Sequence, residues 1–515
     1  MEFDYVIVGA GSAGCVLAAR LTQDPGVTVA LLEAGGRDDK TEIRIPAGFP
    51  KLFKTEYDWD FTTAGQTEMF GRELYWPRGR TLGGSSSLNA QMWVRGTHVD
   101  YDQWGLPGWS YDEVLPYFHR AERRVGTNHG GVYGTSGPIY ISELRSPNPT
   151  TAAFLAACAE AGLTRLTELN GRTNEGYCQT PVTQRRGRRW SAADAYLRPA
   201  SKRPGLTVLT QAHAQRVIFD GTRATGVEYG DGRIVSARKE VILSAGAIGS
   251  PHLLMLSGVG DADELRGAGI EVRHELPGVG RNLMDHLASA IILSCPQPVT
   301  LAGAEGIGQL ARYLLARRGL LTSNVGEAVA FIRTRPDVPA PDVELIFAPA
   351  PFVDHGMTPP AGHGITVASI LLQPESRGRI RLAGRDVVID PCYLTAEADV
   401  RTQIAGLKKA QELLGTSAMK PFAGPPMEPY QGAESDEELA KWIRERSETL
   451  YHPAGTCRMG TGDDAVVDPE LRVRGLTGLR VVDASVMPTL NRGHTHAPTI
   501  MIAERAADLI TTPAP

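Results

Sequence analysis

Three glycines near the start of the chain have the spacing of a phosphate-binding loop. Gly9, Gly11 and Gly14 follow an apolar run that is typical of a buried parallel strand. The first glycine permits a tight turn, the second lets a pyrophosphate approach the backbone, and the third lets a helix pack closely on the strand. Glu33 ends a second apolar run about twenty residues later, where a carboxylate can accept hydrogen bonds from two ribose hydroxyls. This order of features predicts a dinucleotide site.

Three elements must hold this loop in place. The apolar residues 5–8 and 27–32 predict two buried strands, and residues 15–21 between them predict a helix. A helix that begins at the last glycine directs its free N–H groups and the positive end of its dipole towards the phosphates. A glycine-rich turn without a ligand would not need the second strand or the acid after it. The pattern indicates a dinucleotide and leaves open which one.

Two other polar stretches could bind an anion. Residues 83–89 read Gly-Gly-Ser-Ser-Ser-Leu-Asn, a flexible backbone rich in hydrogen-bond donors that suits a phosphate or a polar ring edge. Taken alone, this stretch fits a tight surface turn better. Residues 185–189 contain four arginines, and we expect a solvated turn there rather than an anion site.

The composition argues against several classes of function. The 515 residues are 42% hydrophobic with a net charge of −5, and the pI is near 6.2, so nucleic-acid binding is not expected. No apolar stretch is long enough to span a membrane, and the first strand begins so near Met1 that no room remains for a signal peptide, which predicts a cytoplasmic protein. The six cysteines form no CxxC pair, so neither a metal site nor a disulfide framework is predicted.

The length and the changing pattern of the chain predict more than one domain. Residues 296–445 differ from the rest because strand-like runs alternate there with proline-rich turns, which indicates an antiparallel sheet. The expected fold class is α/β with α+β. A discontinuous Rossmann-type domain would comprise residues 1–155, 205–295 and 446–515, and a second domain on the antiparallel sheet would comprise residues 296–445 with a contribution from 156–204.

Individual elements follow from the periodicity. Helices are predicted over residues 111–124, 151–162, from 251 onwards, 396–414 and 498–510. Strands are predicted over residues 206–219, 224–229, 240–243, 343–347, 364–372, 378–382 and 479–482.

Four separated stretches match one protein family in the same order along the chain. They are the N-terminal loop through Leu32-Glu33-Ala34-Gly35, residues 79–89 (GRTLGGSSSLN), residues 246–260 (GAIGSPHLLMLSGVG), and the C-terminal motifs of residues 452–460 (HPAGTCRMG), 482–485 (VDAS) and 493–499 (GHTHAPT). A weaker match covers residues 374–378. The chain resembles the glucose–methanol–choline oxidoreductases, flavin enzymes that oxidise alcohols, and within them the bacterial choline-dehydrogenase-like and aliphatic-alcohol-dehydrogenase branch.

This resemblance implies that the dinucleotide is FAD. The implied cofactor residues are Gly9, Gly11, Ser12, Ala13 and Gly14 at the pyrophosphate, Glu33 and Ala34 at the adenosine ribose, Trp59, Leu82, Gly84, Ser85, Asn89 and Ala90 along the middle, Ala214 at the adenine, and Asp483, Ala484, His496 and Ala497 at the ribityl chain and ring. Some members attach FAD covalently through a histidine between the serines and the asparagine. Leu88 stands there in this chain, so we expect FAD to bind without a covalent link.

The resemblance also implies a pair of catalytic histidines. His452 stands at the position of the family's catalytic histidine, and histidine suits a general base because its pKa lies near working pH. His494 stands where the family has His or Asn, and it could hold the developing alkoxide or share the proton. The second domain would be the substrate-binding domain. Tyr451 and Glu327 are the candidate substrate contacts, Glu327 as a partner for a quaternary ammonium group or as a structural acid.

The implied reaction is FAD-dependent oxidation of a small alcohol, primary and aliphatic or aromatic, to the aldehyde. Oxygen or a quinone would reoxidise the flavin, and a quinone would require peripheral membrane contact, for which no amphipathic segment stands out in the sequence. The helix expected from residue 498 would stabilise the negative charge of a reduced flavin if it pointed at the pyrimidine edge. The alternatives are a choline-specific enzyme and a hydroxynitrile lyase on the same flavoprotein fold. A flavin-binding protein without turnover and a nicotinamide dehydrogenase fit the motifs less well.

Overall fold

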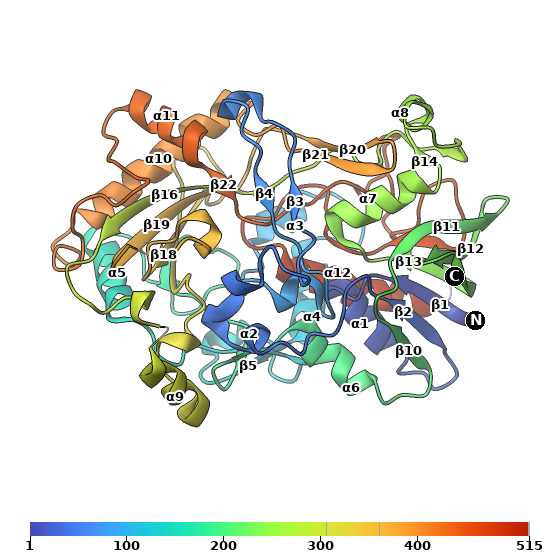
Figure 1. Cartoon of the computed structure of the whole chain (residues 1–515), viewed down its shortest axis with the longest axis horizontal. Coiled ribbons are helices and arrows are strands. Elements are labelled where there is room, and N and C mark those ends of the chain that lie inside the picture. The colour runs from blue at the N-terminus through green and yellow to red at the C-terminus, as the bar shows by residue number, and fades with distance from the viewer. Residues whose placement is uncertain (305, 360, 513–515) are drawn as a thin grey trace.

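Two large β-sheets organise the part of the chain that the structure, a computed structural model, describes: residues 1–304, 306–359 and 361–512. The sheets lie side by side, and the N- and C-terminal segments both belong to the first of them (Figure 1). Within the described ranges, no helix combines the length and the hydropathy that crossing a membrane requires.

The first sheet carries the predicted dinucleotide-binding motif. Its strand order is β10–β2–β1–β13–β12–β11, with β23 also paired to β13. Strands β10, β2, β1, β13 and β23 run parallel, whereas β12 and β11 extend the sheet in antiparallel fashion. The bounds are β1 (Glu2–Val8), β2 (Val29–Leu32), β10 (Leu206–Leu209), β11 (Ala214–Asp220), β12 (Arg223–Tyr229), β13 (Arg233–Leu243) and β23 (Leu479–Val481). The apolar run in β1 is buried on both faces, which explains why it lacks polar alternation.

Helices α1 (Ser12–Leu21) and α12 (His496–Thr511) pack against each other beside this sheet, and α4 (Tyr111–Ala121) packs on α12. The contact between α1 and α12 joins the two ends of the chain. Arg20 donates from Nε and Nη2 to the two carboxylate oxygens of Glu504, each at 2.8 Å, and Glu504 is fully buried. A bidentate pair of this kind satisfies a charge that would otherwise be costly to bury.

The second sheet is antiparallel, as predicted, and its order is β22–β16–β19–β18–β17–β7. Its strands are β7 (Gly176–Gln179), β16 (Leu287–Ser294), β17 (Ala328–Ile332), β18 (Val343–Ala348), β19 (Gly364–Leu371) and β22 (Glu448–Thr449). Helices α5 (Pro149–Glu160), α10 (Glu397–Leu414) and α11 (Asp436–Arg446) pack on this sheet. Alternate residues of β16, such as Ala288, Ala290 and Ile292, instead face a cavity.

The borders of the second sheet differ from the predicted domain limits. Strand β16 lies before residue 296 and β22 lies after residue 445, yet both belong to the antiparallel sheet. Within residues 156–204, the strand β7 pairs with β17 of this sheet. Composition marks where proline-rich turns begin, but it does not show which sheet a strand joins, because that depends on pairing between distant segments.

Several predicted elements have different bounds. The helix predicted to reach residue 124 ends at Ala121 and continues as β5, the stretch 206–219 divides into β10 and β11, and the C-terminal helix begins at His496 rather than 498. Helix α9 (Ile307–Ala316) was not predicted at all. The remaining elements are α2 (Thr41–Arg44), α3 (His98–Asp102), α6 (Arg198–Ala200), α7 (Gly246–Leu256), α8 (Ala262–Gly267), β3 (Phe61–Thr62), β4 (Tyr75–Trp76), β5 (Glu122–Arg124), β6 (Ile139–Ile141), β8 (Gln184–Arg185), β9 (Arg188–Arg189), β14 (Val259–Gly260), β15 (His274–Glu275), β20 (Arg379–Ala383) and β21 (Asp386–Asp390).

Candidate active site

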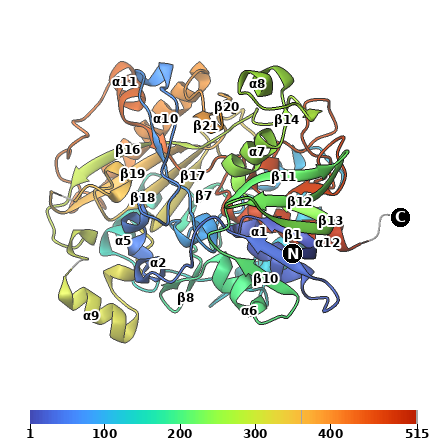
Figure 2. The same ribbon diagram turned by 45° about the vertical axis from the view of Figure 1, so that its right-hand side comes forward.

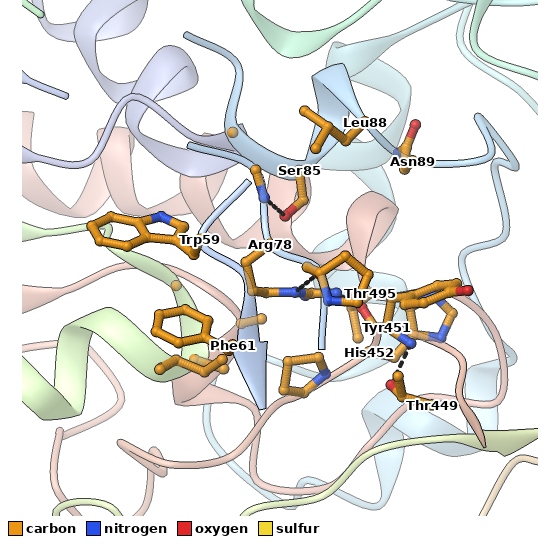
Figure 3. Close-up of a pocket in the computed structure, with 18 of the residues that line it drawn as sticks. Trp59, Phe61, Arg78, Ser85, Leu88, Asn89, Thr449, Tyr451, His452 and Thr495 are labelled. Carbon is orange, nitrogen blue, oxygen red and sulfur yellow. Dashed lines mark hydrogen bonds between the residues drawn. The ribbon is translucent and has the colours of Figure 1, made fainter. Parts of the chain in front are cut away.

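A cavity of about 990 Å³ is lined by residues of both sheets. At one end lie the residues that follow the carboxyl ends of β1, β2 and β13, which is where parallel sheets of this kind bind ligands. At the other end lies the free face of the antiparallel sheet. Figure 3 shows Trp59 and Phe61 on one side of the cavity and Tyr451 and His452 on the other. One cavity thus joins the predicted dinucleotide site to the predicted histidines.

The glycine loop has the close contacts that its sequence requires. Gly9 has φ +98°, and a Cβ atom there would lie 2.5 Å from the carbonyl oxygen of Ser244. A Cβ atom on Gly14 would lie 1.9 Å from the carbonyl oxygen of Gly9, so only glycine lets α1 start this near β1. At Gly11 a Cβ atom would meet nothing within 4 Å. The loop is therefore tight on the side of the protein and open at its middle glycine, as a loop that receives a phosphate must be.

Glu33 stands at the carboxyl end of β2 and lines the cavity. Its two oxygens each accept one backbone hydrogen bond of 2.9 Å, from the N–H of Ala10 and the N–H of Gly35. Burial raises the pKa of Glu33 to about 7, although these two donors act in the opposite direction. Each oxygen keeps a lone pair, so the carboxylate can still accept a hydrogen bond from each of two hydroxyls.

The serine-rich loop packs directly on the glycine loop. The N–H of Gly83 donates to the carbonyl oxygen of Ala10 across 2.7 Å, and a Cβ atom on Gly84 would lie 2.7 Å from Cα of Gly11. Gly84 has φ +53°. This contact makes the stretch a wall of the cavity, so the expectation of a simple surface turn is wrong.

Arg189 supports the same loop from behind. It is fully buried, and its Nη1 donates to the side-chain oxygen of Asn89 at 2.7 Å and to the carbonyl oxygen of Ser86 at 3.2 Å. Burial lowers the pKa of this guanidinium to about 9. The prediction of a solvated arginine turn is therefore wrong for Arg189, which orients Asn89 instead.

The C-terminal motif contributes Asp483 and His496. Asp483 accepts hydrogen bonds from the N–H of Gly246 at 2.9 Å and from the hydroxyl of Ser250 at 2.6 Å, which ties the end of β23 to α7. Nδ1 of His496 lies 3.0 Å from the hydroxyl of Ser12. Nε2 of His496 is buried and has no hydrogen-bond partner among the described residues, which leaves a polar atom at the cavity ready for a ligand.

The structure brings most of the predicted cofactor residues to this one cavity. The residues that line it are Gly9, Gly11, Ser12, Ala13, Glu33, Ala34, Trp59, Gly84, Ser85, Asn89, Ala90, Ala214, Asp483, Ala484 and His496. Gly14, Leu82 and Ala497 do not line it. Gly14 and Ala497 are buried within the protein, and Leu82 packs against the hydrophobic core.

His452 is held by His286, a residue that the sequence had left without a role. Nδ1 of His452 lies 2.9 Å from Nδ1 of His286, and Nε2 of His286 lies 3.1 Å from the carbonyl oxygen of Leu372. A carbonyl oxygen only accepts, so His286 carries its proton on Nε2. Burial lowers the pKa of His286 to about 3, so its ring is neutral and its Nδ1 is an acceptor.

The same hydrogen bond determines the protonation of His452. Because Nδ1 of His286 accepts, Nδ1 of His452 must donate. Burial lowers the pKa of His452 well below 6.5, and the charge of neighbouring His494 lowers it further. Nε2 of His452 therefore keeps its lone pair, and no described residue hydrogen-bonds to it. This atom is a proton acceptor at the wall of the cavity.

His494 has an acidic partner instead of a neutral one. Its Nε2 lies 3.2 and 3.0 Å from the two carboxylate oxygens of Glu344 in β18, and a carboxylate accepts, so Nε2 of His494 donates. The side chain of Glu344 is fully buried, and among the described residues only His494 hydrogen-bonds or ion-pairs with it. The rings of His452 and His494 lie 4.8 Å apart. Two adjacent histidines are thus held by partners of different charge.

Asp285, the neighbour of His286, fixes the backbone around His452. Its Oδ1 accepts from the N–H of His452 at 2.7 Å, and its Oδ2 accepts from the hydroxyl of Thr449 at 2.6 Å and from the hydroxyl of Tyr393. Burial raises the pKa of this carboxyl to about 6. Two consecutive residues before β16 therefore position the main chain and the ring of His452.

Tyr451 occupies an unusual backbone conformation beside the catalytic candidate. Its φ is +68°, which costs a non-glycine residue about 1–3 kcal/mol and is common at functional sites. The Arg78 guanidinium donates to the Tyr451 carbonyl oxygen at 2.5 Å, and the Tyr451 hydroxyl lies 2.8 Å from Nδ1 of His355. These contacts hold the tyrosine at the cavity wall, where it stays a candidate substrate contact.

Glu327 does not reach the cavity. It is fully buried, and its oxygens accept hydrogen bonds from the N–H of Asn148 at 2.7 Å, from the hydroxyl of Thr151 at 2.7 Å and from the hydroxyl of Ser323 at 2.5 Å. The structure gives this acid a structural role, which removes it as a substrate contact. Within the described residues there is also no group of three or more His, Cys, Asp or Glu side chains that could hold a metal ion.

Comparisons with known proteins agree with this geometry. The family model described as GMC oxidoreductase matches residues 3–288 with its N-terminal part and residues 374–503 with its C-terminal part. An uncharacterized GMC-type oxidoreductase of Mycobacterium tuberculosis is 52% identical over 99% of both chains. The alcohol dehydrogenase [acceptor] of Pseudomonas putida and the mitochondrial choline dehydrogenase of Homo sapiens are each 42% identical over 99% of this chain and 95% and 90% of theirs.

A solved structure shows the same fold. Formate oxidase of Aspergillus oryzae, studied for modification of its FAD, aligns with a TM-score of 0.92 over 99% of this chain and 98% of its own, at 29% identity. The relatives and this solved structure align over the whole cavity, whereas the family model leaves out residues 289–373, which form part of the cavity wall. The chain belongs to the GMC oxidoreductase family.

Proposed function

We propose that the protein oxidises an alcohol to the aldehyde with FAD as its cofactor. The observation that carries this proposal is that one cavity joins the dinucleotide-binding loop to an unprotonated Nε2 of His452. When bound, FAD would supply the acceptor for the hydride that leaves the alcohol carbon. The residues of the chain would bind the cofactor, orient the alcohol and accept its proton.

The cavity fits FAD in three respects. The glycine loop is open at Gly11, the oxygens of Glu33 keep lone pairs for ribose hydroxyls, and Nε2 of His496 is buried without a partner among the described residues. Thr495 and His496, at the start of α12, also line the cavity, so the positive end of that helix dipole faces the bound group. Negative charge that develops on a flavin near this end would be stabilised.

The contacts of the two histidines support different roles for them. His452 would be the base, because His286 fixes its proton on Nδ1 and leaves Nε2 free. His494 would be the protonated partner, because a fully buried carboxylate such as Glu344 requires a compensating positive charge. A cationic ring beside the base would hold the alkoxide oxygen as the proton leaves. If His494 were the base instead, and therefore neutral, the buried charge of Glu344 would have no compensating cation.

The wall of the cavity favours an uncharged alcohol. Part of this wall is formed by Ala290, Ile346 and Ala368 of the antiparallel sheet, with Phe49 and Phe53 from the segment that follows α2. Apolar side chains of this kind bind an aliphatic or aromatic group through its buried surface. Glu327, the acid proposed for a quaternary ammonium group, is already satisfied within the protein. We therefore infer a primary aliphatic or aromatic alcohol rather than choline.

A panel of alcohols tests this proposal. Purified enzyme is incubated with hexanol, benzyl alcohol, choline or a cyanohydrin, with oxygen or a soluble quinone analogue as acceptor, and aldehydes are measured. We expect aldehyde from the uncharged primary alcohols. Aldehyde from choline alone would overturn the substrate assignment, and aldehyde plus cyanide from the cyanohydrin without any acceptor would favour a lyase.

The pH dependence follows from the pKa of His452. Burial first, and the charge of His494 second, lower this pKa well below 6.5. A base acts in its unprotonated form, so a lowered pKa keeps it active as the pH falls, and activity is lost only when the pH passes below the lowered pKa. We expect kcat/KM to stay constant through pH 6.5 and to decline only well below it. A decline centred at pH 6.5 or above would contradict this assignment.

We also propose that FAD is held without a covalent bond at residue 88. Leu88 lines the cavity at this position, and its side chain carries no nucleophile (Figure 3). Acid precipitation of the holoenzyme should leave the yellow colour in the supernatant. Flavin that remains in the washed pellet would contradict non-covalent binding.

A further inference from the structure

Helix α9 exposes an unusual concentration of apolar side chains. Eight large hydrophobic residues are exposed in the described part of the chain, and four of them lie on this ten-residue helix. Ile307 is 87% exposed, Leu310 43%, Leu314 54% and Leu315 89%. Single exposed apolar residues are common on protein surfaces, whereas a cluster indicates an interaction site.

These side chains lie on the side of α9 that faces away from the protein. Ile307, Leu310 and Leu314 are spaced three and four residues apart, which places them on one helical face, and Leu315 adjoins them. The opposite side holds the helix to the body, since Tyr313 is buried and donates from its hydroxyl to the carbonyl oxygen of Arg44 at 3.1 Å. Figures 1 and 2 both show α9 at the periphery of the molecule.

Positive charge borders this apolar face. Arg312, Arg317 and Arg318 lie in or directly after α9, and residues 306–326 contain no aspartate or glutamate. None of the three arginines forms an ion pair with a described carboxylate, and Arg317 lies over the ring of Tyr313. An apolar face with arginines beside it matches the boundary between the headgroups and the acyl chains of an anionic lipid bilayer.

We propose that α9 docks the protein on the surface of an anionic membrane. The helix would lie in the plane of the interface, with the apolar face towards the acyl chains and the arginines at the phosphates. A second copy of the chain fits less well, because a symmetric contact through α9 would bring two sets of three arginines together. No amphipathic segment stood out in the sequence, but the fold shows that α9 has an apolar face bordered by arginines.

The position of α9 relates the membrane to the cavity. The helix packs on the turn η7 (Leu320–Thr322), η7 packs on η1 (Pro46–Leu52), and Phe49 of η1 lines the cavity. Docking by α9 would place this wall of the cavity near the bilayer surface. Apolar alcohols and quinones both concentrate in bilayers, so either could reach the protein from there.

Vesicle co-sedimentation of the full-length holoenzyme tests the proposal. Sedimentation is compared for vesicles of phosphatidylcholine alone and vesicles with ~30 mol% phosphatidylglycerol, at low and at high salt. We expect binding to the anionic vesicles that weakens as salt rises. The double variant Leu314→Gln/Leu315→Gln and the double variant Arg312→Gln/Arg318→Gln should each bind about tenfold or more weakly.

Ile234→Gln is the matched control, because Ile234 is 51% exposed on β13 away from α9. It should bind as the wild type does, and all variants should oxidise a soluble alcohol with a soluble acceptor at the wild-type rate. Absence of vesicle binding by the wild type, or equal binding by the α9 variants, would overturn the proposal. Concentration-dependent dimers in sedimentation velocity that the leucine variant abolishes would assign the face to a second copy instead.

Discussion

The His452→Gln variant is expected to bind FAD normally and to oxidise alcohols ~10²–10⁴-fold more slowly than the wild type. Glutamine retains hydrogen bonding to His286 but has no basic nitrogen to replace Nε2, so the hydroxyl proton has no acceptor. The loss should fall on kcat and on kcat/KM alike, because a base acts in the transition state and contributes little to binding of the ground state. Steady-state kinetics with the best alcohol of the panel measures it.

The control for this variant is His129→Gln, at an exposed position outside the cavity. It should retain wild-type rates, and both variants should show the wild-type flavin spectrum. A His452→Gln enzyme that keeps more than about a tenth of the wild-type kcat would show that another group accepts the proton.

The His494→Ala variant is expected to lose about 10²–10³ in kcat, which is the range for removing one donor to a developing oxyanion. The physical reason is that Glu344 hydrogen-bonds this imidazole, which would act as a donor to the alkoxide 4.8 Å, ring to ring, from the proposed base. Removal of the cation should also raise the pKa of His452, because His494 is one of the causes that lower it. The acid limb of kcat/KM should therefore move to higher pH in this variant.

The Glu344→Gln variant tests whether catalysis needs a positive charge on His494 or only its imidazole ring. Glutamine fills the same space and can still accept a hydrogen bond from His494, but it carries no charge to compensate a cation. We expect a smaller loss of kcat, an unchanged KM within about twofold, and the same upward shift of the acid limb. Glu344→Asp should restore part of the activity. A stable Glu344→Gln enzyme with the wild-type pH profile would show that Glu344 is only structural.

The parts of the site that depend on local sequence could be predicted. A glycine loop, its flanking strands and its acid lie within some thirty residues, and each glycine is required by a contact within that unit, such as Gly14 against Gly9. The histidines His452 and His494 were identified through their motif, because a single histidine carries no local signal of catalysis. The observed starts and ends of helices differ from the predicted ones by a few residues, because helix ends depend on capping and on packing.

The partners that give the histidines their roles could not be predicted. His286 is 166 residues from His452, and Glu344 is 150 residues from His494, so local sequence shows neither pair. The first pair forms because β16 and β22 are neighbours in the antiparallel sheet, and the second because the segment before α12 lies against that sheet. One signal was present in the sequence, since His286 and Asp285 stand directly before a strand. Glu327 is a candidate that the structure does not support, because this acid within the predicted substrate domain accepts hydrogen bonds from Asn148, Thr151 and Ser323 inside the protein.

Anaerobic reduction of the bound flavin is the most direct test of the central claim that His452 and the dinucleotide site act together on an alcohol. Wild-type holoenzyme is mixed with an uncharged primary alcohol without oxygen, and the flavin absorbance is followed with time beside the His452→Gln variant. We expect the wild type to bleach with formation of one aldehyde per flavin and the variant to bleach ~10²–10⁴-fold more slowly. Equal bleaching rates, or a wild-type flavin that no alcohol reduces, would contradict it.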